Sequence, residues 1–160
     1  MHHDWQSLGP NEVQVMSAGT GVQHSEINGS TDTYLSLFQI WIIPNELNVS
    51  PRYDQKYFEE RTRKNEMQTL VTSINSSHSG SLKIHQNARI SRIDLDKGLE
   101  FEYTTLSATH GVYVMNITGE IQLDRLNASQ RDAIGVSETE NFIIKANENS
   151  QLLLIEVPML

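Results

Sequence analysis

Histidines and carboxylates are the residues of this 160-residue chain that could bind a metal ion or move a proton. The sequence contains no Cys, so disulfides, iron–sulfur clusters and thiol catalysis are excluded, and His and acidic side chains remain as the strong metal ligands. A chain without Cys also fits a reducing compartment, and we therefore expect a cytoplasmic protein. The six histidines are His2, His3, His24, His78, His85 and His110.

Nucleophilic and phosphate-binding chemistry is not indicated by the spacing of the polar residues. Ser25 is flanked by His24 and Glu26, and neighbouring side chains on a strand point to opposite faces, so these residues do not predict a Ser-His-Asp arrangement. The Ala-Gly-Thr-Gly stretch at 18–21 lacks the Lys and the strand-to-helix context of a phosphate-binding loop. It predicts a turn between two strands.

The three histidines at 78, 85 and 110 show no metal-ligand spacing. His85 lies on a β-rich run and His110 precedes Gly111, and neither belongs to a His-x-His or His-x-Glu pair. We predict structural roles for both. His78 lies in Asn-Ser-Ser-His-Ser-Gly at 75–80, a composition typical of a solvated linker.

The charge balance of the chain is acidic. With 12 Lys and Arg against 20 Asp and Glu, the net charge of -8 opposes binding to a phosphate backbone. No apolar run approaches the ~20 residues that a bilayer-spanning helix needs. The first residues, Met1 to Asp4, do not have the pattern of a signal peptide. We expect neither direct nucleic-acid binding nor a membrane partner.

Short apolar runs bounded by Gly, Asn, Ser or Asp dominate the chain, and they predict an all-β sandwich or barrel. One short helix is predicted at 58–65. Gly119 predicts a hairpin between strands at 111–118 and 120–123. The last run is apolar on both faces, which predicts a central or covered strand. The predicted strands are 12–17, 35–43, 68–72, 81–85, 88–95, 99–104, 111–118, 120–123, 133–136, 141–145 and 151–157.

Several stretches carry a resemblance to one family. Met16-Ser-Ala-Gly-Thr-Gly-Val-Gln-His-Ser-Glu26 resembles the second metal-binding stretch of the pirin family, whose bacterial members include quercetin 2,3-dioxygenase-like proteins. The resemblance continues in a consistent order through 38–44, 51–53, 80–86 and 154–158. It implies a bicupin, with two jelly-roll β-sandwiches in tandem. Residues 1–70 would be the remnant of an incomplete N-terminal cupin domain, and residues 71–160 would form the C-terminal cupin domain.

The resemblance also implies a metal site. In the family, the N-terminal barrel holds one non-haem iron through three His and one Glu, arranged as a His-x-His pair and a later His-x-Glu pair. This sequence contains the second pair, His24 and Glu26. Residues two apart on a strand project from one face, and imidazole with carboxylate suits Fe(II) or another divalent transition metal. The His-x-His pair is missing, so His2, His3 or a second chain would have to complete the site.

Two functions follow from this resemblance. The first is a metal-dependent quercetin 2,3-dioxygenase, in which His24 would fix the metal and Glu26 would be both a ligand and the catalytic base for a flavonol hydroxyl. The second is a non-catalytic protein-binding or transcriptional co-regulatory module, and a sugar-binding jelly roll is a third reading. Four aromatic residues could line a pocket for a small aromatic substrate, or they could serve ordinary core packing. They are Phe38, Trp41, Tyr53 and Tyr57. Apolar alternation favours core packing for Phe38.

An incomplete first barrel has a consequence for assembly. It should leave sheet edges and apolar core surface exposed, which a monomer tolerates poorly. We therefore expect a homodimer or larger homo-oligomer that covers the gap.

Overall fold

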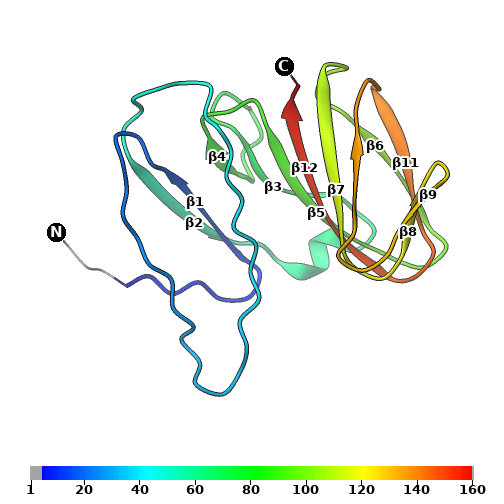
Figure 1. Ribbon diagram of the computed structural model, residues 1–160, viewed down its shortest axis with the longest axis horizontal. Coiled ribbons are helices and arrows are strands. Elements are labelled where there is room, and N and C mark those ends of the chain that lie inside the picture. Colours follow the sequence, from blue (N-terminus) through cyan, green and yellow to red (C-terminus); the bar gives the residue numbers. More distant parts are fainter. Residues whose placement is uncertain (1–4, 160) are drawn as a thin grey trace.

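The computed structural model describes residues 5–159, and strands dominate it (Figure 1). The one short helical turn in this part of the chain is η1 (Glu60–Arg63). The strands are β1 (Glu12–Ser17), β2 (Arg52–Tyr57), β3 (Gln68–Ser73), β4 (Leu82–Ile84), β5 (Arg89–Leu95), β6 (Glu100–Thr104), β7 (His110–Thr118), β8 (Ile121–Leu123), β9 (Leu126–Ala128), β10 (Ala133–Val136), β11 (Asn141–Ala146) and β12 (Ser150–Pro158).

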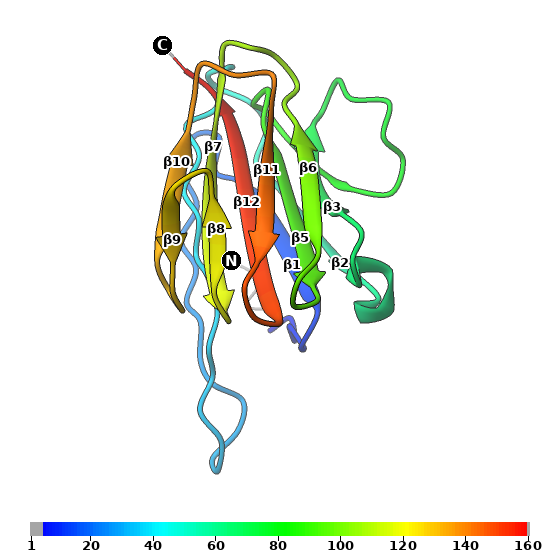
Figure 2. The same cartoon turned by 90° about the vertical axis from the view of Figure 1, so that its right-hand side faces the viewer.

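Two sheets form a β-sandwich from the C-terminal part of the chain (Figure 2). The six-stranded sheet has the order β10-β7-β12-β5-β3-β4, and the four-stranded sheet has the order β6-β11-β8-β9. All neighbours in these sheets pair antiparallel except β3 with β4, which pair parallel. The architecture confirms the prediction of an all-β jelly-roll sandwich.

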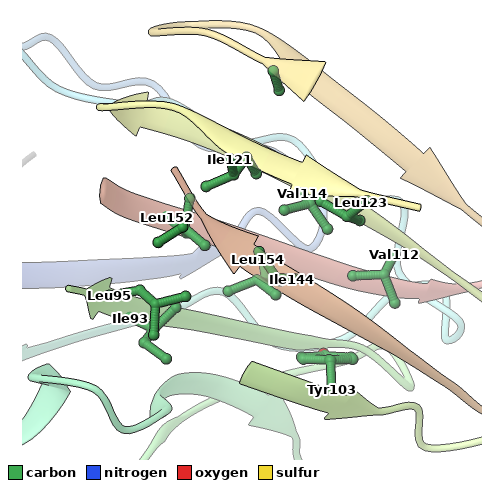
Figure 3. Packing of buried hydrophobic residues seen from close by; sticks show 12 residues of the cluster. Ile93, Leu95, Tyr103, Val112, Val114, Ile121, Leu123, Ile144, Leu152 and Leu154 are labelled. Atoms are coloured by element: carbon green, nitrogen blue, oxygen red, sulfur yellow. The ribbon is translucent and has the colours of Figure 1, made fainter. Parts of the chain in front are cut away.

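The main core lies between the two sheets (Figure 3). It is built from alternate residues of facing strands, and burying one such aliphatic side chain contributes roughly 1.5–3 kcal/mol. Its large members are Ile93, Leu95, Val112, Val114, Leu152 and Leu154 from the six-stranded sheet, with Tyr103, Ile121, Leu123 and Ile144 from the other. These residues hold the two layers together.

Strand β12 is buried on both faces. Leu152 and Leu154 point into the main core, while Leu153 lies between them on the opposite face and joins a second core. β12 pairs with β5 on one side and β7 on the other. The prediction that the last apolar run is a central strand is therefore confirmed, because every side of it is covered.

The second core lies on the outer face of the six-stranded sheet. It contains Phe58, Leu70, Val71, Leu82, Ile90 and Leu153. Val13 and Val15 of β1 pack against it, and β1 pairs antiparallel with β2 to form a separate two-stranded sheet. The apolar alternation of β1 thus covers the sandwich on one side.

Arg63 of η1 connects the two-stranded sheet to the sandwich. Its side chain is almost fully buried, with Nε 2.8 Å from Asp94 Oδ2 of β5. Its Nη1 also donates to Oδ1 of Asn11, at 2.9 Å, and Asn11 lies immediately before β1. A buried guanidinium needs such partners, because an unpaired charge in this position would be strongly unfavourable. The contact fixes β1 against the sandwich.

Several sequence predictions are corrected by the fold. Residues 35–43 form no strand, because no neighbouring strand in the described structure pairs with them. The helix predicted at 58–65 is reduced to the single turn η1, and strands β2 and β9 were not predicted. The 75–80 stretch is a loop between β3 and β4 of one sheet, and the predicted division at residue 70 falls within β3. That division into two domains stays a prediction.

The hairpin predicted at Gly119 is also wrong. β7 belongs to the six-stranded sheet and β8 to the four-stranded sheet, so the Gly119 turn carries the chain from one layer to the other. Gly119 has a φ of 86°, and a Cβ there would overlap Asn149 O and Ser150. Only glycine avoids both problems at this crossing.

No helix within residues 5–159 is both long and apolar enough to span a membrane.

Candidate ligand site on the outer face of β1 and β2

The two faces of the β1–β2 sheet differ in character. Val13 and Val15 face the second core, so Gln14, between them, points away from it. In the antiparallel register Gln14 lies opposite Gln55, and Met16 lies opposite Tyr53. The outer face of this sheet is therefore polar and aromatic. The segment 18–51, which connects β1 to β2 and which we call the excursion, contacts this face through Glu26.

Four side chains on this face form a hydrogen-bonded group that we name the Gln14 cluster: Gln14, Glu26, Tyr53 and Gln55. Gln14 Nε2 donates to Glu26 Oε1 at 3.1 Å. The Tyr53 hydroxyl lies 2.5 Å from Gln55 Oε1 and 3.3 Å from Gln14 Oε1, so its single proton serves the nearer acceptor. Gln55 Nε2 donates to the carbonyl of Ser7 at 2.8 Å. The cluster joins Glu26 to both strands.

The Tyr53 hydroxyl is a stable proton donor. Partial burial and then the negative charge of Glu12 raise the pKa of Tyr53 above its ordinary value. Both causes disfavour the phenolate. At neutral pH this group can donate a hydrogen bond to an oxygen-bearing ligand but cannot act as a base.

His24 and Glu26 lie in the excursion, outside any strand. Both are exposed, and Glu26 Oε1 accepts a hydrogen bond from Gln14 Nε2. Within residues 5–159 no group of three or more His, Cys, Asp or Glu side chains could hold a metal ion. The two donors suit a divalent transition metal in type, but they do not complete a site. His2 and His3 lie outside the described residues.

The aromatic residues considered for a substrate pocket separate into two groups. Tyr53 and Tyr57 lie on β2, partly exposed on the outer face. Phe38 and Trp41 lie in the excursion, half exposed and 88% exposed respectively, so the expectation of core packing for Phe38 is wrong. Phe38 stays outside because, among residues 5–159, no strand pairs with the 35–43 segment.

A buried ionic group in the C-terminal sandwich was missed by the sequence reasoning. Glu156 of β12 is fully buried, and its Oε2 lies 2.8 Å from Arg89 and accepts the Tyr103 hydroxyl at 2.9 Å. Its Oε1 lies 3.2 Å from His110 Nδ1 and accepts the backbone N–H of Leu106. A charged residue in the alternating apolar pattern of 151–157 was the available signal.

The contacts of Glu156 connect the two sheets at one end of the sandwich. Arg89 lies on β5, His110 on β7 and Tyr103 on β6. The Arg89 guanidinium stacks over the Tyr103 ring, 4.7 Å from its centroid. Burial is the main cause that raises the pKa of Tyr103 far above its ordinary value. His110 thus contacts a buried carboxylate, as befits a structural residue.

His85 has a different environment. Its Nδ1 lies 3.5 Å from Glu46 Oε2, and its backbone carbonyl accepts the N–H of Asn45 at 2.8 Å. These contacts connect the end of β4 to the excursion.

Comparison with known proteins places the chain in a family. The model of the quercetinase C-terminal cupin domain matches residues 70–157, and the pirin model matches residues 2–42. A quercetin 2,3-dioxygenase of Escherichia coli is 35% identical over 92% of this chain and 61% of its own length. A pirin-like protein of Caulobacter vibrioides is 30% identical over 91% of this chain and 61% of its own length.

A solved structure supports the same relationship. The crystal structure of a bacterial pirin from Escherichia coli in complex with nickel(II) superposes with a TM-score of 0.84 at 31% identity. The match covers 94% of this chain and 62% of that protein. This chain thus spans a little over three fifths of the length of these relatives. From the matched domain models, the sequence identity and the shared fold together, the chain belongs to the pirin family of cupin proteins.

Proposed function

We propose that this chain is a pirin-like cupin that carries half of a quercetin 2,3-dioxygenase metal site, and that it oxygenates a flavonol only when further ligands reach His24 and Glu26. The observation that supports this proposal is the pair itself, one imidazole and one carboxylate two residues apart. Two such donors hold Fe(II) or a similar divalent ion weakly, because a facial arrangement needs at least three protein ligands.

The Gln14 cluster supports a ligand of the flavonol class beside this pair. The Tyr53 hydroxyl and the Gln14 amide can exchange their present partners for the oxygens of a polyhydroxylated aromatic molecule. Tyr57 offers an aromatic face on the same side of β2, since residues two and four apart share a face. In this arrangement Tyr53 donates a proton in a hydrogen bond, and Gln14 orients Glu26.

The test is anaerobic titration of the whole chain with Fe(II) and Ni(II), followed by elemental analysis. We expect weak binding that is lost in His24→Ala. His78→Ala is the matched control, because His78 is also exposed but lies in the β3–β4 loop. Equal binding by the wild type and His24→Ala would overturn the role of His24.

The stoichiometry of the bound ion separates the two parts of the proposal. Tight, near-stoichiometric iron that is lost in His24→Ala would contradict the half site, since other groups would then complete it. Oxygen uptake with quercetin would then follow from the chain alone. We expect no such uptake, and Tyr53→Phe should weaken quercetin binding measured by fluorescence without changing metal affinity.

A second candidate function is a non-catalytic protein-binding module of the co-regulatory kind. It is favoured by the exposed apolar side chains of the excursion, which no metal chemistry requires. This role predicts that His24→Ala leaves the binding of a protein partner unchanged. Pull-down with the purified partner, comparing His24→Ala with wild type, would contradict it if binding were lost. The cytoplasmic location also stays a prediction.

A further inference from the structure

The C-terminal sandwich is open along one side. Strand β10 lies at an edge of the six-stranded sheet, and β9 lies at an edge of the four-stranded sheet. β11 pairs with β8 through residues 144–146, so among residues 5–159 no strand pairs with 141–143 on the side away from β6. A cavity of about 620 Å³, which we call the side pocket, lies between this half of β11, the β8–β9 turn and β10.

The side pocket belongs to the C-terminal sandwich alone. Its lining residues fall between positions 123 and 143, inside the stretch 70–157 that matches the model of the quercetinase C-terminal cupin domain. In Figure 1, β8 and β9 lie on the opposite side of the molecule from β1 and β2, and Figure 2 views this side directly. The opening is therefore made by β8, β9, β10 and β11, and the excursion takes no part in it.

The inner wall of the side pocket continues the main core. Leu126 lies opposite Leu123 in the β8–β9 register, so the two side chains share the inner face. Leu123 is 5% exposed, but Leu126 is 59% exposed although it points toward the interior. Ile134 and Val136 of β10 and Phe142 of β11 pack against the main core and line the same pocket. The pocket is thus an apolar opening into the space between the two sheets.

The size of the side pocket suits a small molecule. Ligand sites in proteins commonly have volumes of roughly 300–1,000 Å³ and are lined mainly by apolar and aromatic side chains with a few polar groups. Phe142 supplies the aromatic surface, and its ring packs against Tyr103 with the ring centroids 5.2 Å apart. A bound ring system would remove the apolar surface of Leu126, Ile134 and Phe142 from water, which is the main source of affinity expected here.

The charge of the lining decides which class of ligand suits the pocket. Among the described residues that line it, Asp124 is the only ionised one, and Ser137 and Asn141 are neutral hydrogen-bonding residues. The two turns at the rim, residues 124–125 and 137–140, together carry three carboxylates and one guanidinium. An anionic ligand would be repelled here, whereas a cation beside Asp124 would be attracted.

We propose that the side pocket binds a small molecule that joins an apolar ring system to a single ammonium group. The rings lie against Leu126 and Phe142, and the ammonium group lies beside the Asp124 carboxylate. The side chains of Ser137 and Asn141 supply hydrogen-bonding groups for the polar end of the ligand. The proposal is independent of metal binding, because His24 and Glu26 lie in the excursion.

Titration of the isotope-labelled whole chain, followed by NMR of its backbone amides, tests the proposal. The probes are 1-naphthylmethylamine, 1-naphthalenemethanol and 1-naphthoate, which share one ring system and are cationic, neutral and anionic at neutral pH. We expect saturable shifts at residues 123–126, 134–137 and 141–143. The amine should bind about two- to five-fold more tightly than the alcohol, since an exposed ion pair contributes little free energy, and naphthoate should bind most weakly.

Two variants separate the apolar contact from the charge. Leu126→Trp places a larger ring in the mouth of the pocket and should abolish the saturable shifts with all three probes. Asp124→Asn keeps the shape of the side chain and tolerates the positive φ of 49° at this turn, and it should remove the preference for the amine over the alcohol. Leu99→Trp is the matched control, because Leu99 is also a partly exposed leucine but accepts the N–H of Ala146, at the far end of β11.

Four results would overturn the proposal. Shifts confined to residues 18–51 would place the probes on the excursion, and the absence of saturable shifts with every probe would show that the pocket does not take a ring system. Equal binding of naphthoate and the amine would contradict the role of Asp124. Binding retained by Leu126→Trp, in a variant whose other amide signals match the wild type, would exclude the side pocket.

Discussion

The C-terminal sandwich and the excursion at 18–51 contain similar apolar residues in very different surroundings. Tyr103 is buried between two sheets, packs 5.2 Å from Phe142, and donates to Glu156. Tyr34 has the same side chain and is fully exposed. The difference is the presence of neighbouring strands, because a β-strand buries its side chains and pairs its backbone only against a partner. Apolar composition alone does not produce a core.

The largest effect in this comparison is expected at Glu156. Replacing it by Ala leaves the partly buried Arg89 and the buried His110 without their carboxylate, and losing one partner of a buried ion pair costs about 3–5 kcal/mol. Urea unfolding followed by circular dichroism measures this change. Glu102→Gln, on the exposed side of β6, is the control and should lie near the wild type. A loss for Glu156→Ala no larger than for the control would show that the ionic group does not hold the two sheets.

Truncating one apolar side chain in each region sharpens the comparison. Leu154→Ala removes a fully buried side chain from the main core, and the free energy of unfolding should fall by about 2–5 kcal/mol. Trp41→Ala removes a larger side chain from the excursion, yet the free energy of unfolding should change by less than about 0.5 kcal/mol, because Trp41 is exposed. Both values come from the same urea titration, followed by circular dichroism. Equal losses would mean that the excursion packs as tightly as the sandwich.

A substitution at Gly119, in the turn that connects the two sheets, should have a smaller effect on stability. Gly119→Ala places a side chain at a positive φ and against Asn149 and Ser150, which should cost about 1–3 kcal/mol. Gly98 also has a positive φ, of 84°, but open space around its Cβ position, so Gly98→Ala separates backbone strain from overlap. The melting temperature of Gly119→Ala should be lower than that of Gly98→Ala. The opposite order would mean that the overlap is relieved without cost.

The smallest expected effect appears at alkaline pH. The folded pKa of Tyr103 is raised above its ordinary value of 10.0, chiefly by burial, so the unfolded chain loses this proton first as pH rises. The stability that the protonated phenol contributes is therefore fully present below pH 10 and is lost as pH rises from there toward the folded pKa. Tyr103→Phe should show a shallower decline in melting temperature over this range. An unchanged slope would assign the decline to other groups.

The candidate site was only partly predictable. His24 and Glu26 could be named because the 16–26 stretch resembles a metal-binding stretch of the pirin family, and such a motif is local in the sequence. The Gln14 cluster could not, because Gln14 and Tyr53 lie far apart in the chain and meet only through the β1–β2 register. The pairing of His110 with Glu156 is likewise non-local and joins β7 to β12.

The sequence by itself determined where side chains alternate and where turns fall, since both depend on residues a few positions apart. It therefore predicted β1, β10 and the central position of β12. Only the tertiary structure decided the segments at which the local pattern and the observed strands disagree. Arg52–Tyr57 is polar and charged but forms β2 because β1 lies beside it, whereas the apolar segment at 35–43 forms no strand for want of a neighbour in the described structure. A strand is defined by the hydrogen bonds of its partner, and that partner is chosen by distant parts of the chain.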